Sequence, residues 1–382
     1  MKKICNLVID ATTVKSGGGI YHLGLLLKYI DHNQDSLNIN LKECIVTSKF
    51  FSYSLNLNLS KKTQDCLTLA NVRNFIYPFF QFINISKRIK KYQNPSFLVL
   101  TSLNFIRSKN VYIMPQNTLP TNLTEIKKYG ISIEALRLIT LRNLNLYSIK
   151  KAKRIIFISK YAMQQNLNCI SKEVDRKKLI SKSVINYLPI NKIDDNPKLN
   201  KNYTQICKSK LTKLLYISRV DYYKNHDYII EELELYMENY KKNIEFLSGG
   251  YIYKPYYKRF KNLFSKKWAN FKGNISYEEV LKLYKKYHFG IFASTCESCP
   301  TIVLEMMNYG LPFVICDLPL YDEIVPSVYP RFKIGKPGSL SNALNKLISN
   351  PNLINEIIIK GRRQVKLFKP EESLSALLST IN

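Results

Sequence analysis

Short apolar runs alternate with segments of helical periodicity along the whole chain, and this alternation restricts the fold more than any other feature. Strands are predicted in the first half at 4–10, 43–47, 97–101, 111–114, 155–159 and 183–187, and helices at 20–30, 132–151 and 160–168. The second half repeats the pattern, with strands at 214–219, 244–247, 271–273, 290–293, 313–316 and 331–334 and helices at 227–238, 256–264, 277–287, 300–308 and 340–348, followed by helical tails at 352–366 and 371–379. Alternation of this kind indicates an α/β architecture with parallel sheets.

The chain has 382 residues, which is more than one ordinary hydrophobic core holds and fits two domains. A polar stretch at 191–210 contains Asp194, Asp195, Asn196 and Pro197 and is typical of a linker. We therefore predict a first domain over 1–192 and a second that begins at 193. Open parallel sheets bind ligands at the carboxyl ends of their strands, so the expected site is the cleft between the two domains.

The 58 lysines and arginines outnumber the 28 aspartates and glutamates, which gives a formal net charge of +30. A net charge of this size indicates what kind of binding partner the protein has, and it does not indicate the fold. Nucleic acid, an anionic membrane surface and phosphorylated small molecules would each suit it, and a solvated lysine-rich surface would also explain it. The basic, aromatic segment 251–268 could hold single-stranded nucleic acid, but no zinc finger, RNA-recognition motif or helix-turn-helix pattern accompanies it.

Residues 75–92 place aromatic and aliphatic side chains before Lys87, Arg88, Lys90 and Lys91. This order resembles an element that lies on a membrane surface, and core packing followed by a solvated lysine face is the alternative. Asp10 interrupts the first apolar run, so no secretory signal is evident, and no stretch reaches the roughly 20 apolar residues of a membrane-spanning helix. We expect a protein that is soluble or peripheral, and cytoplasmic.

Eight cysteines are scattered along the chain, and only Cys296 and Cys299 form a C-x-x-C pair. A zinc or redox site there has little support, because no second cysteine or histidine pair stands at zinc spacing. Thiols in a reducing compartment are the better interpretation, so no metal is expected.

Two polar motifs directly follow predicted strands. Gly18 and Gly19 belong to a glycine run after the first strand, where the backbone could approach a ligand beside a helix amino-terminus; a plain strand-to-helix turn fits equally well. Arg219 is the last residue of the strand predicted at 214–219, and Lys224 follows that strand. Together they could neutralise a diphosphate, although two exposed loop cations would give the same pattern.

Glu297 and Glu305 are separated by seven residues and frame the sequence ESCPTIVLE. Glu297 falls on the loop after the strand at 290–293, and Glu305 falls on the helix at 300–308, with Pro300 in its first turn. The positive end of that helix points to the same place, so one carboxylate could bind sugar hydroxyls and the other ribose hydroxyls near a phosphate. Ordinary surface charge is the alternative, and a glycoside hydrolase would need its two carboxylates to flank one scissile bond.

In order, the glycine run and the segments FISKYA, YISRVDYYKNHD, FLSGG, FKGNIS and ASTCESCPTIVLEMMNYGLPFVICDLP resemble the retaining GT-B glycosyltransferases, in particular glycosyltransferase family 4, the glycosyl transferases group 1. The resemblance is specific over 214–325 and looser in the first half. It implies a GT-B fold of two Rossmann-like, parallel-sheet domains that face a central cleft. Residues 1–192 would form the acceptor side, 193–365 the nucleotide-sugar side, and 366–382 a helix that crosses back to the first domain.

The resemblance also implies roles for individual residues. Arg219 and Lys224 match the family's diphosphate-binding pair, and Glu297 and Glu305 match its two glutamates, with Glu297 near the sugar and Glu305 near the ribose. Glu297, Arg219 and Lys224 would be catalytic. Further donor contacts would come from Gly18, Gly19, Ser298, Cys299, Thr301 and Ile302, and Asn117 would lie on the acceptor side. Pro300 departs from the family's glycines and has no N–H to donate.

The implied activity is that of a retaining hexosyltransferase that works without a metal or another cofactor. A sugar would pass from a nucleotide-sugar to a growing glycan in surface polysaccharide, O-antigen or lipopolysaccharide biosynthesis. The basic surface and residues 75–92 favour a lipid-linked acceptor. The expected partners are the nucleotide-sugar, the lipid-linked acceptor and an anionic membrane surface at the inner face of the membrane, and no nucleic acid. The alternative is a non-catalytic GT-B-like protein or a basic nucleic-acid-binding protein.

Overall fold

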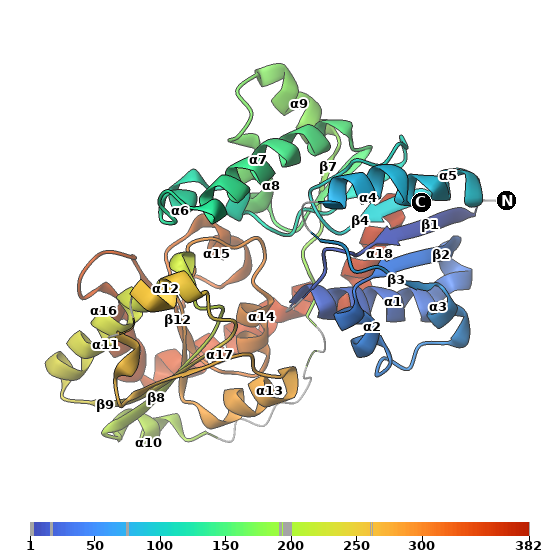
Figure 1. Ribbon diagram of the computed structural model, residues 1–382. Coiled ribbons are helices and arrows are strands. Elements are labelled where there is room, and N and C mark those ends of the chain that lie inside the picture. Colours follow the sequence, from blue (N-terminus) through green and yellow to red (C-terminus); the bar gives the residue numbers. More distant parts are fainter. Residues whose placement is uncertain are drawn as a thin grey trace. The chain divides into compact units, whose positions relative to one another are not determined.

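The computed structural model describes residues 4–15, 18–73, 76–190, 193, 201–259, 261 and 263–381. By its internal contacts the chain divides into two units (Figure 1). The first unit comprises Met1–Ile126, Gly130–Lys192 and Phe368–Asn382, and the second comprises Lys127–Tyr129 and Ile193–Leu367. The predicted linker residues Asp194, Asp195, Asn196 and Pro197 lie outside the described residues.

The first unit is an α/β layer structure built on one parallel sheet. Its elements are β1 (Cys5–Asp10), α1 (Gly18–Leu37), β2 (Ile39–Val46), α2 (Ser48–Ser54), α3 (Lys61–Asp65), β3 (Leu67–Leu69), α4 (Tyr77–Ile83), η2 (Ile85–Lys87), α5 (Arg88–Lys91), β4 (Ser96–Val99), β5 (Val111–Ile113), η3 (Leu119–Thr121), α6 (Leu123–Lys127), α7 (Ile133–Lys151), β6 (Arg154–Phe157), α8 (Lys160–Leu167), α9 (Glu173–Ser181), β7 (Ser183–Ile185) and α18 (Pro370–Ile381). The seven strands pair in the order β3-β2-β1-β4-β5-β6-β7, and every described pairing is parallel.

The inner strand β1 shows that this sheet is buried on both faces. Leu7, Val8 and Ile9 are all fully buried, although successive side chains of a strand point to opposite faces. One face packs against residues of α7, α8 and α9, among them Ile149 and Leu167. Helices on both faces are what a continuous apolar run in a parallel sheet requires.

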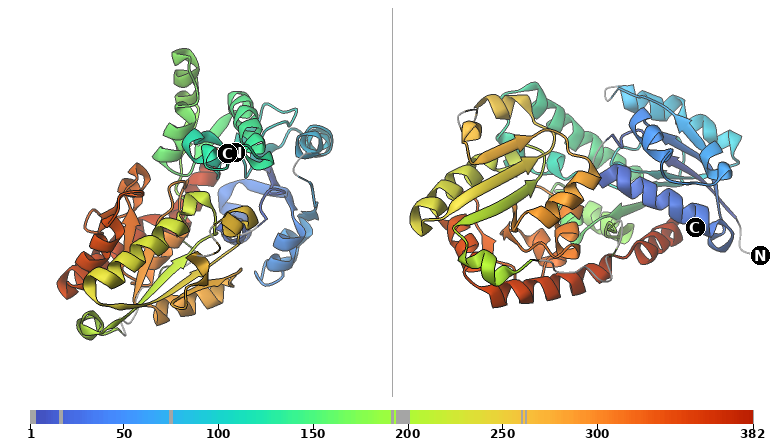
Figure 2. Two further views of the ribbon diagram at one scale, coloured as in Figure 1. Left: turned by 60° about the vertical axis from the view of Figure 1, so that its left-hand side comes forward. Right: turned by 90° about the horizontal axis from the view of Figure 1, so that it is seen from below.

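The last helix, α18, packs within the first unit and lies beside α1 (Figure 2). The Ser373 hydroxyl donates to the Tyr187 carbonyl oxygen at 2.7 Å, and the Asn186 amide donates to the Ser373 carbonyl oxygen at 3.0 Å. The Ile190 N–H donates to the Phe368 carbonyl oxygen at 3.2 Å, just before the helix begins. Hydrogen bonds to backbone carbonyls fix the entry of the chain into α18.

The second unit has the same kind of layering. Its elements are α10 (Tyr203–Lys208), β8 (Leu211–Ile217), η4 (Tyr222–Lys224), α11 (His226–Tyr240), β9 (Asn243–Gly249), α12 (Lys254–Arg259), η5 (Leu263–Ser265), β10 (Ala269–Lys272), α13 (Tyr277–Lys286), β11 (Phe289–Phe292), α14 (Thr301–Asn308), β12 (Phe313–Cys316), α15 (Pro319–Ile324), β13 (Arg331–Phe332), α16 (Ser339–Ile348), α17 (Pro351–Val365) and η6 (Lys366–Phe368). The strands pair in parallel in the order β10-β9-β8-β11-β12-β13.

The predicted α/β class with parallel sheets is confirmed, and several details differ. The edge strand β3 and the short helices α2 to α6, α9, α10 and α15 were not predicted, because pieces of three to nine residues carry little periodic signal. The helix predicted at 256–264 ends at Arg259 and is followed by the 3-10 turn η5. Gly18 and Gly19 form the first turn of α1 instead of preceding it.

Candidate functional site

Three of the predicted site residues of the second unit, Arg219, Lys224 and Glu297, lie on the loops at the carboxyl ends of β8 and β11. These strands are neighbours, and the order of strands reverses between them, since β9 and β10 lie on one side and β12 and β13 on the other. In open α/β sheets this switch point is where ligands bind, because the loops diverge there. Arg219 and Lys224 follow β8, and Glu297 follows β11.

Lys224 and Glu297 form an ion pair across this switch point, from the lysine Nζ to the glutamate Oε1. Lys224 is buried, at 8% exposure. Burial acts to lower the pKa of Lys224, but the charges of Glu297 and the Tyr223 and Tyr216 hydroxyls act in the opposite direction, and the pKa lies above its usual value. Lys224 is therefore a firmly protonated cation held against a carboxylate.

The loops that carry this pair are held by hydrogen bonds to backbone carbonyl oxygens. The Asn225 amide donates to the Ala293 carbonyl oxygen at 2.7 Å, and the Thr295 N–H donates to the Tyr223 carbonyl oxygen at 2.8 Å. The Tyr216 hydroxyl donates to the Lys224 carbonyl oxygen at 3.1 Å. Asn225 has a φ of 52°, a left-handed conformation that asparagine tolerates better than most residues. The turn η4 thus has a defined position beside the Glu297 loop.

Arg219 pairs with Asp221, from Nε to Oδ2 at 2.8 Å, and is 42% exposed at its side chain. Its guanidinium lies over the rings of Tyr251 and Tyr253, at 4.9 and 5.8 Å from their centroids. Burial raises the pKa of Tyr223 to about 12, and the charges of Lys224, Glu297, Arg219 and Asp221 all act on its hydroxyl. The predicted cations and Glu297 therefore share one neighbourhood, with Arg219 on its solvent side.

Glu305 lies on α14 in a different environment. Tyr284 of α13 donates a hydrogen bond to its Oε2 at 3.1 Å. Burial raises the pKa of Glu305 to about 7, although the hydrogen bond from Tyr284 acts to lower it. Glu305 stands four residues after Thr301, so both lie on one face of the helix.

The start of α14 is built from the predicted donor-binding segment. Pro300 is the N-cap residue, not a member of the first turn as predicted, and Ser298 and Cys299 before it are buried. Thr301 and Ile302 begin the helix, where the first N–H groups have no intrahelical acceptor. All eight cysteines are thiols, and the described residues contain no cluster of three ligands suited to a metal ion.

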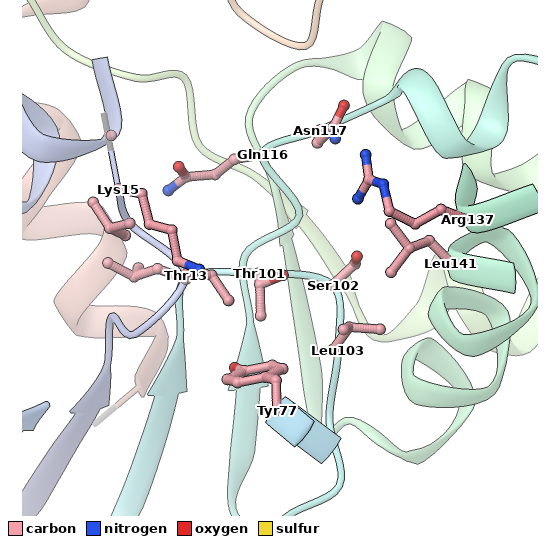
Figure 3. Close-up of a pocket in the computed structure, with 13 residues that line it drawn as sticks. Thr13, Lys15, Tyr77, Thr101, Ser102, Leu103, Gln116, Asn117, Arg137 and Leu141 are labelled. Atoms are coloured by element: carbon pink, nitrogen blue, oxygen red, sulfur yellow. The ribbon is translucent and has the colours of Figure 1, made fainter. Parts of the chain in front are cut away.

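The first unit contains a pocket of about 360 Å³ at the carboxyl ends of β1, β4 and β5 (Figure 3). Gly19 and Asn117, two of the residues singled out in the sequence, both line it. Gly18 is exposed and does not line it. Beneath the pocket, Asp10 is fully buried and accepts hydrogen bonds from the Tyr77 hydroxyl at 2.7 Å and the Gln81 amide at 2.9 Å.

Residues 204–364 match the family model of the glycosyl transferases group 1. The resemblance to the glycosyl transferases group 1 is confirmed by this match, which covers nearly all of the second unit and contains Arg219, Lys224, Glu297 and Glu305. No curated protein sequence matches the chain at a significant level.

Solved glycosyltransferase structures share the fold over almost the whole chain. HepE from Anabaena, solved with UDP and glucose and also with UDP-glucose, has a TM-score of 0.67 at 13% identity, and the match covers 98% of this chain and 99% of HepE. A glycosyltransferase from Rickettsia africae has a TM-score of 0.67 at 15% identity, with coverage of 100% and 98%. WaaG, a glycosyltransferase involved in lipopolysaccharide biosynthesis, has a TM-score of 0.66 at 12% identity, with coverage of 98% and 99%. The predicted GT-B class is confirmed, and family match and fold together support a transferase.

Several residues of the two sites had not been singled out as functional. Asn225 and Asp221 stand in the motif YISRVDYYKN, and an asparagine or aspartate beside a turn is a signal that could have found them. Tyr284 carries no comparable signal, because its partner Glu305 comes from another element. Gln116 is recognised only through its place in the pocket lining.

Proposed function

We propose that the protein is a retaining glycosyltransferase that moves a hexose-type sugar from a nucleotide-sugar to a growing, lipid-linked glycan in surface polysaccharide or lipopolysaccharide biosynthesis. The observation that carries the proposal is the ion pair of the buried Lys224 with the partly buried Glu297, at the switch point of a sheet whose sequence matches the glycosyl transferases group 1 model. A fixed cation beside a fixed carboxylate suits a ligand that presents phosphate and hydroxyl groups side by side.

The donor would lie against the loops after β8 and β11. Arg219 and Lys224 would bind its diphosphate, with the ring-stacked guanidinium of Arg219 on the solvent side. Glu297 contacts Lys224 through Oε1, which leaves Oε2 to accept from a sugar hydroxyl. Backbone N–H groups of Ser298, Cys299, Thr301 and Ile302 would donate to donor oxygens at the positive end of α14, and Glu305 would bind the ribose.

In the proposed reaction, the bond between the anomeric carbon and the diphosphate oxygen breaks, and an acceptor hydroxyl oxygen bonds to the same face of that carbon. The acceptor proton passes to the departing phosphate oxygen, so the configuration is retained. Lys224 and Arg219 would stabilise the negative charge that develops on the diphosphate. Their fixed positions beside Glu297 and Asp221 reduce the reorganisation needed during the step.

The similar structures support a nucleotide-sugar as the donor and a surface glycan as the acceptor. HepE was solved with UDP-glucose, which supports a hexose nucleotide as the donor here. WaaG acts in lipopolysaccharide biosynthesis, and WaaB is a lipopolysaccharide outer core galactosyltransferase, which supports a surface glycan as the acceptor. We expect neither a metal nor another cofactor in the reaction.

An anionic membrane surface is the proposed location, on the cytoplasmic side. None of the helices in the described residues is long and apolar enough to cross a bilayer. In the first unit, α4 exposes Phe79 and Ile83, and α7 exposes Ile133 and Leu136, to between 52% and 89%. Exposed lysines follow α4 at 87, 90 and 91, whereas those of α7, at 150 and 151, stand at the opposite end of the helix from Ile133 and Leu136. Exposed apolar side chains flanked by cations favour a membrane interface.

Part of the segment 75–92 packs into the first unit and is not available to a membrane. Arg88 pairs with Glu43 at 2.7 Å, and Tyr77, Gln81 and Ile85 are buried. Phe75, where the predicted membrane element begins, lies outside the described residues.

Donor hydrolysis without an acceptor tests the proposed activity. We expect slow release of sugar from UDP-glucose or another nucleotide-sugar of a panel, and a loss of about 100-fold or more in Lys224→Ala and Glu297→Gln, because both remove charge placed at the diphosphate and sugar. With an acceptor extract, NMR should find the donor's anomeric configuration in the product.

The matched control is Lys272→Ala, which removes a lysine from an exposed pair with Glu279 in the same unit. Its rate should equal that of the wild type. The proposal fails if no donor is bound or hydrolysed, or if Lys224→Ala and Lys272→Ala behave alike.

A further inference from the structure

The pocket of the first unit occupies the switch point of its own sheet. The strand order is β3-β2-β1-β4-β5-β6-β7, so the order reverses between β1 and β4. Thr13 and Lys15 follow β1, Ser102 follows β4, and Gln116 follows β5, and all four line the pocket (Figure 3). Its volume of about 360 Å³ lies within the range of ligand sites, which is roughly 300–1,000 Å³.

The charges at this pocket favour an anion. Among the described residues, its lining includes two cations, Lys15 and Arg137, and no carboxylate. Glu134, one turn before Arg137, accepts two hydrogen bonds from its guanidinium, from Nε to Oε2 at 2.8 Å and from Nη2 to Oε1 at 2.5 Å, and so offsets part of its charge. Asp10 lies beneath the pocket, where its carboxylate accepts hydrogen bonds from Thr12, Tyr77 and Gln81.

The side-chain amide of Gln116 is a hydrogen-bond donor at the pocket. Its Nε2 is buried and has no hydrogen-bond acceptor within the part of the chain that the structure describes. A buried amide without an acceptor costs free energy, and a ligand oxygen in the pocket would satisfy it. In Figure 3 the Gln116 side chain extends from the β5 loop toward Lys15 and Thr13.

The amino-terminus of α1 adds to the positive potential. Gly19, in the first turn of this 20-residue helix, lines the pocket, and that turn contains no acidic residue. The N–H groups at the start of a helix carry partial positive charge. They stand on the side of the pocket occupied by Lys15.

We propose that this pocket binds the acceptor through an anionic substituent, a phosphate or a carboxylate on the acceptor glycan or its carrier. Lys15, Arg137 and the first turn of α1 hold the anion, and Gln116 donates to a neighbouring oxygen. The assignment of this ligand as the acceptor rests on the glycosyltransferase activity proposed above, whereas its negative charge rests on the pocket alone.

Calorimetric titration with glucose 6-phosphate, glucuronate and glucose tests the proposal. We expect at least one of the two anions to bind about tenfold or more tightly than glucose, because hydrogen bonds to charged groups are the stronger ones. A preference for glucose 6-phosphate identifies a phosphate and a preference for glucuronate a carboxylate. Lys15→Gln, Arg137→Gln and the isosteric Gln116→Glu should each weaken that anion by about tenfold.

Glu134→Gln should strengthen binding of the anion a few-fold, since it frees the Arg137 guanidinium, and a merely structural role of Arg137 would not produce this gain. Lys224→Ala should leave anion binding unchanged, because Lys224 belongs to the second unit.

The proposal is overturned if glucose binds as tightly as both anions, if the lining variants bind like the wild type, or if Lys224→Ala abolishes binding. A failure of the proposed activity alone would give a different result. Nucleotide-sugars would then not be hydrolysed, but anion binding would still depend on Lys15 and Arg137.

Discussion

Two glutamates of the second unit show how the surroundings of a side chain set its charge. Glu297 contacts a buried lysine, whereas Glu305 accepts a hydrogen bond from the neutral phenol of Tyr284. Burial raises the pKa of Glu305 to about 7, from an ordinary value of 4.5. The same residue type therefore forms an ion pair with a lysine at one position and has a raised pKa at the other.

The raised pKa of Glu305 predicts a pH-dependent stability. Between pH 4.5 and about 7 the folded state keeps a proton that the unfolded state loses, so the free energy of unfolding falls as the pH rises through this window and levels off above it. Glu305→Gln lacks this group, and its stability relative to the wild type should rise over the window by at most about 3 kcal/mol.

Urea unfolding at pH 5 and pH 7.5 measures the change for Glu305→Gln. Glu279→Gln, at an exposed position on α13, is the control and should show no such difference. If wild type and Glu305→Gln keep a constant difference between the two pH values, Glu305 does not titrate in this window.

At the scale of elements, the 3-10 turn η4 decides where Lys224 lies. Asn225 follows the turn with a φ of 52° and joins it to β11 through the Ala293 carbonyl oxygen. Asn225→Gly keeps the backbone conformation but loses this hydrogen bond, while Asn225→Ala loses both. We expect Asn225→Ala to be less stable than Asn225→Gly by about 1 kcal/mol, the cost of a left-handed residue with a Cβ.

Urea unfolding measures this difference, and donor hydrolysis should decrease in both variants because Lys224 is displaced. Lys241, at the end of α11, also has a left-handed φ, of 51°, but lies outside the turn. Lys241→Gly should therefore gain stability without a change in hydrolysis. Equal hydrolysis by Asn225→Ala and the wild type would contradict the role assigned to η4.

For the whole molecule, the net charge of +30 and the exposed apolar residues of α4 and α7 predict binding to anionic vesicles. Vesicles with anionic lipid should sediment the protein at about 0.01 M salt and release much of it at about 0.15 M, where the Debye length shortens from about 30 to about 8 Å. Phe79→Ser and Leu136→Ser should weaken this binding, because they remove apolar area from the interface.

Ile359→Ser is the control for vesicle binding, since Ile359 is equally exposed on α17 of the second unit. It should bind as the wild type does. Equal binding of the protein to neutral and anionic vesicles would contradict an electrostatic contribution.

The amino-acid sequence by itself determined the α/β class, the parallel sheets and the resemblance of the second unit to the glycosyl transferases group 1, because these depend on local periodicity and on contiguous motifs such as the one from Glu297 to Glu305. Short elements such as β3 were missed, since three residues form a strand only where a neighbouring strand offers its backbone.

Only the tertiary structure decided which residues meet. Lys224 and Glu297 lie 73 residues apart and form a pair because β8 and β11 are neighbours in the sheet. Likewise, the burial that raises the pKa of Glu305 and leaves the Gln116 amide without an acceptor comes from packing between distant segments. Pairing and burial are properties of the folded chain, so they cannot be read from the order of residues alone.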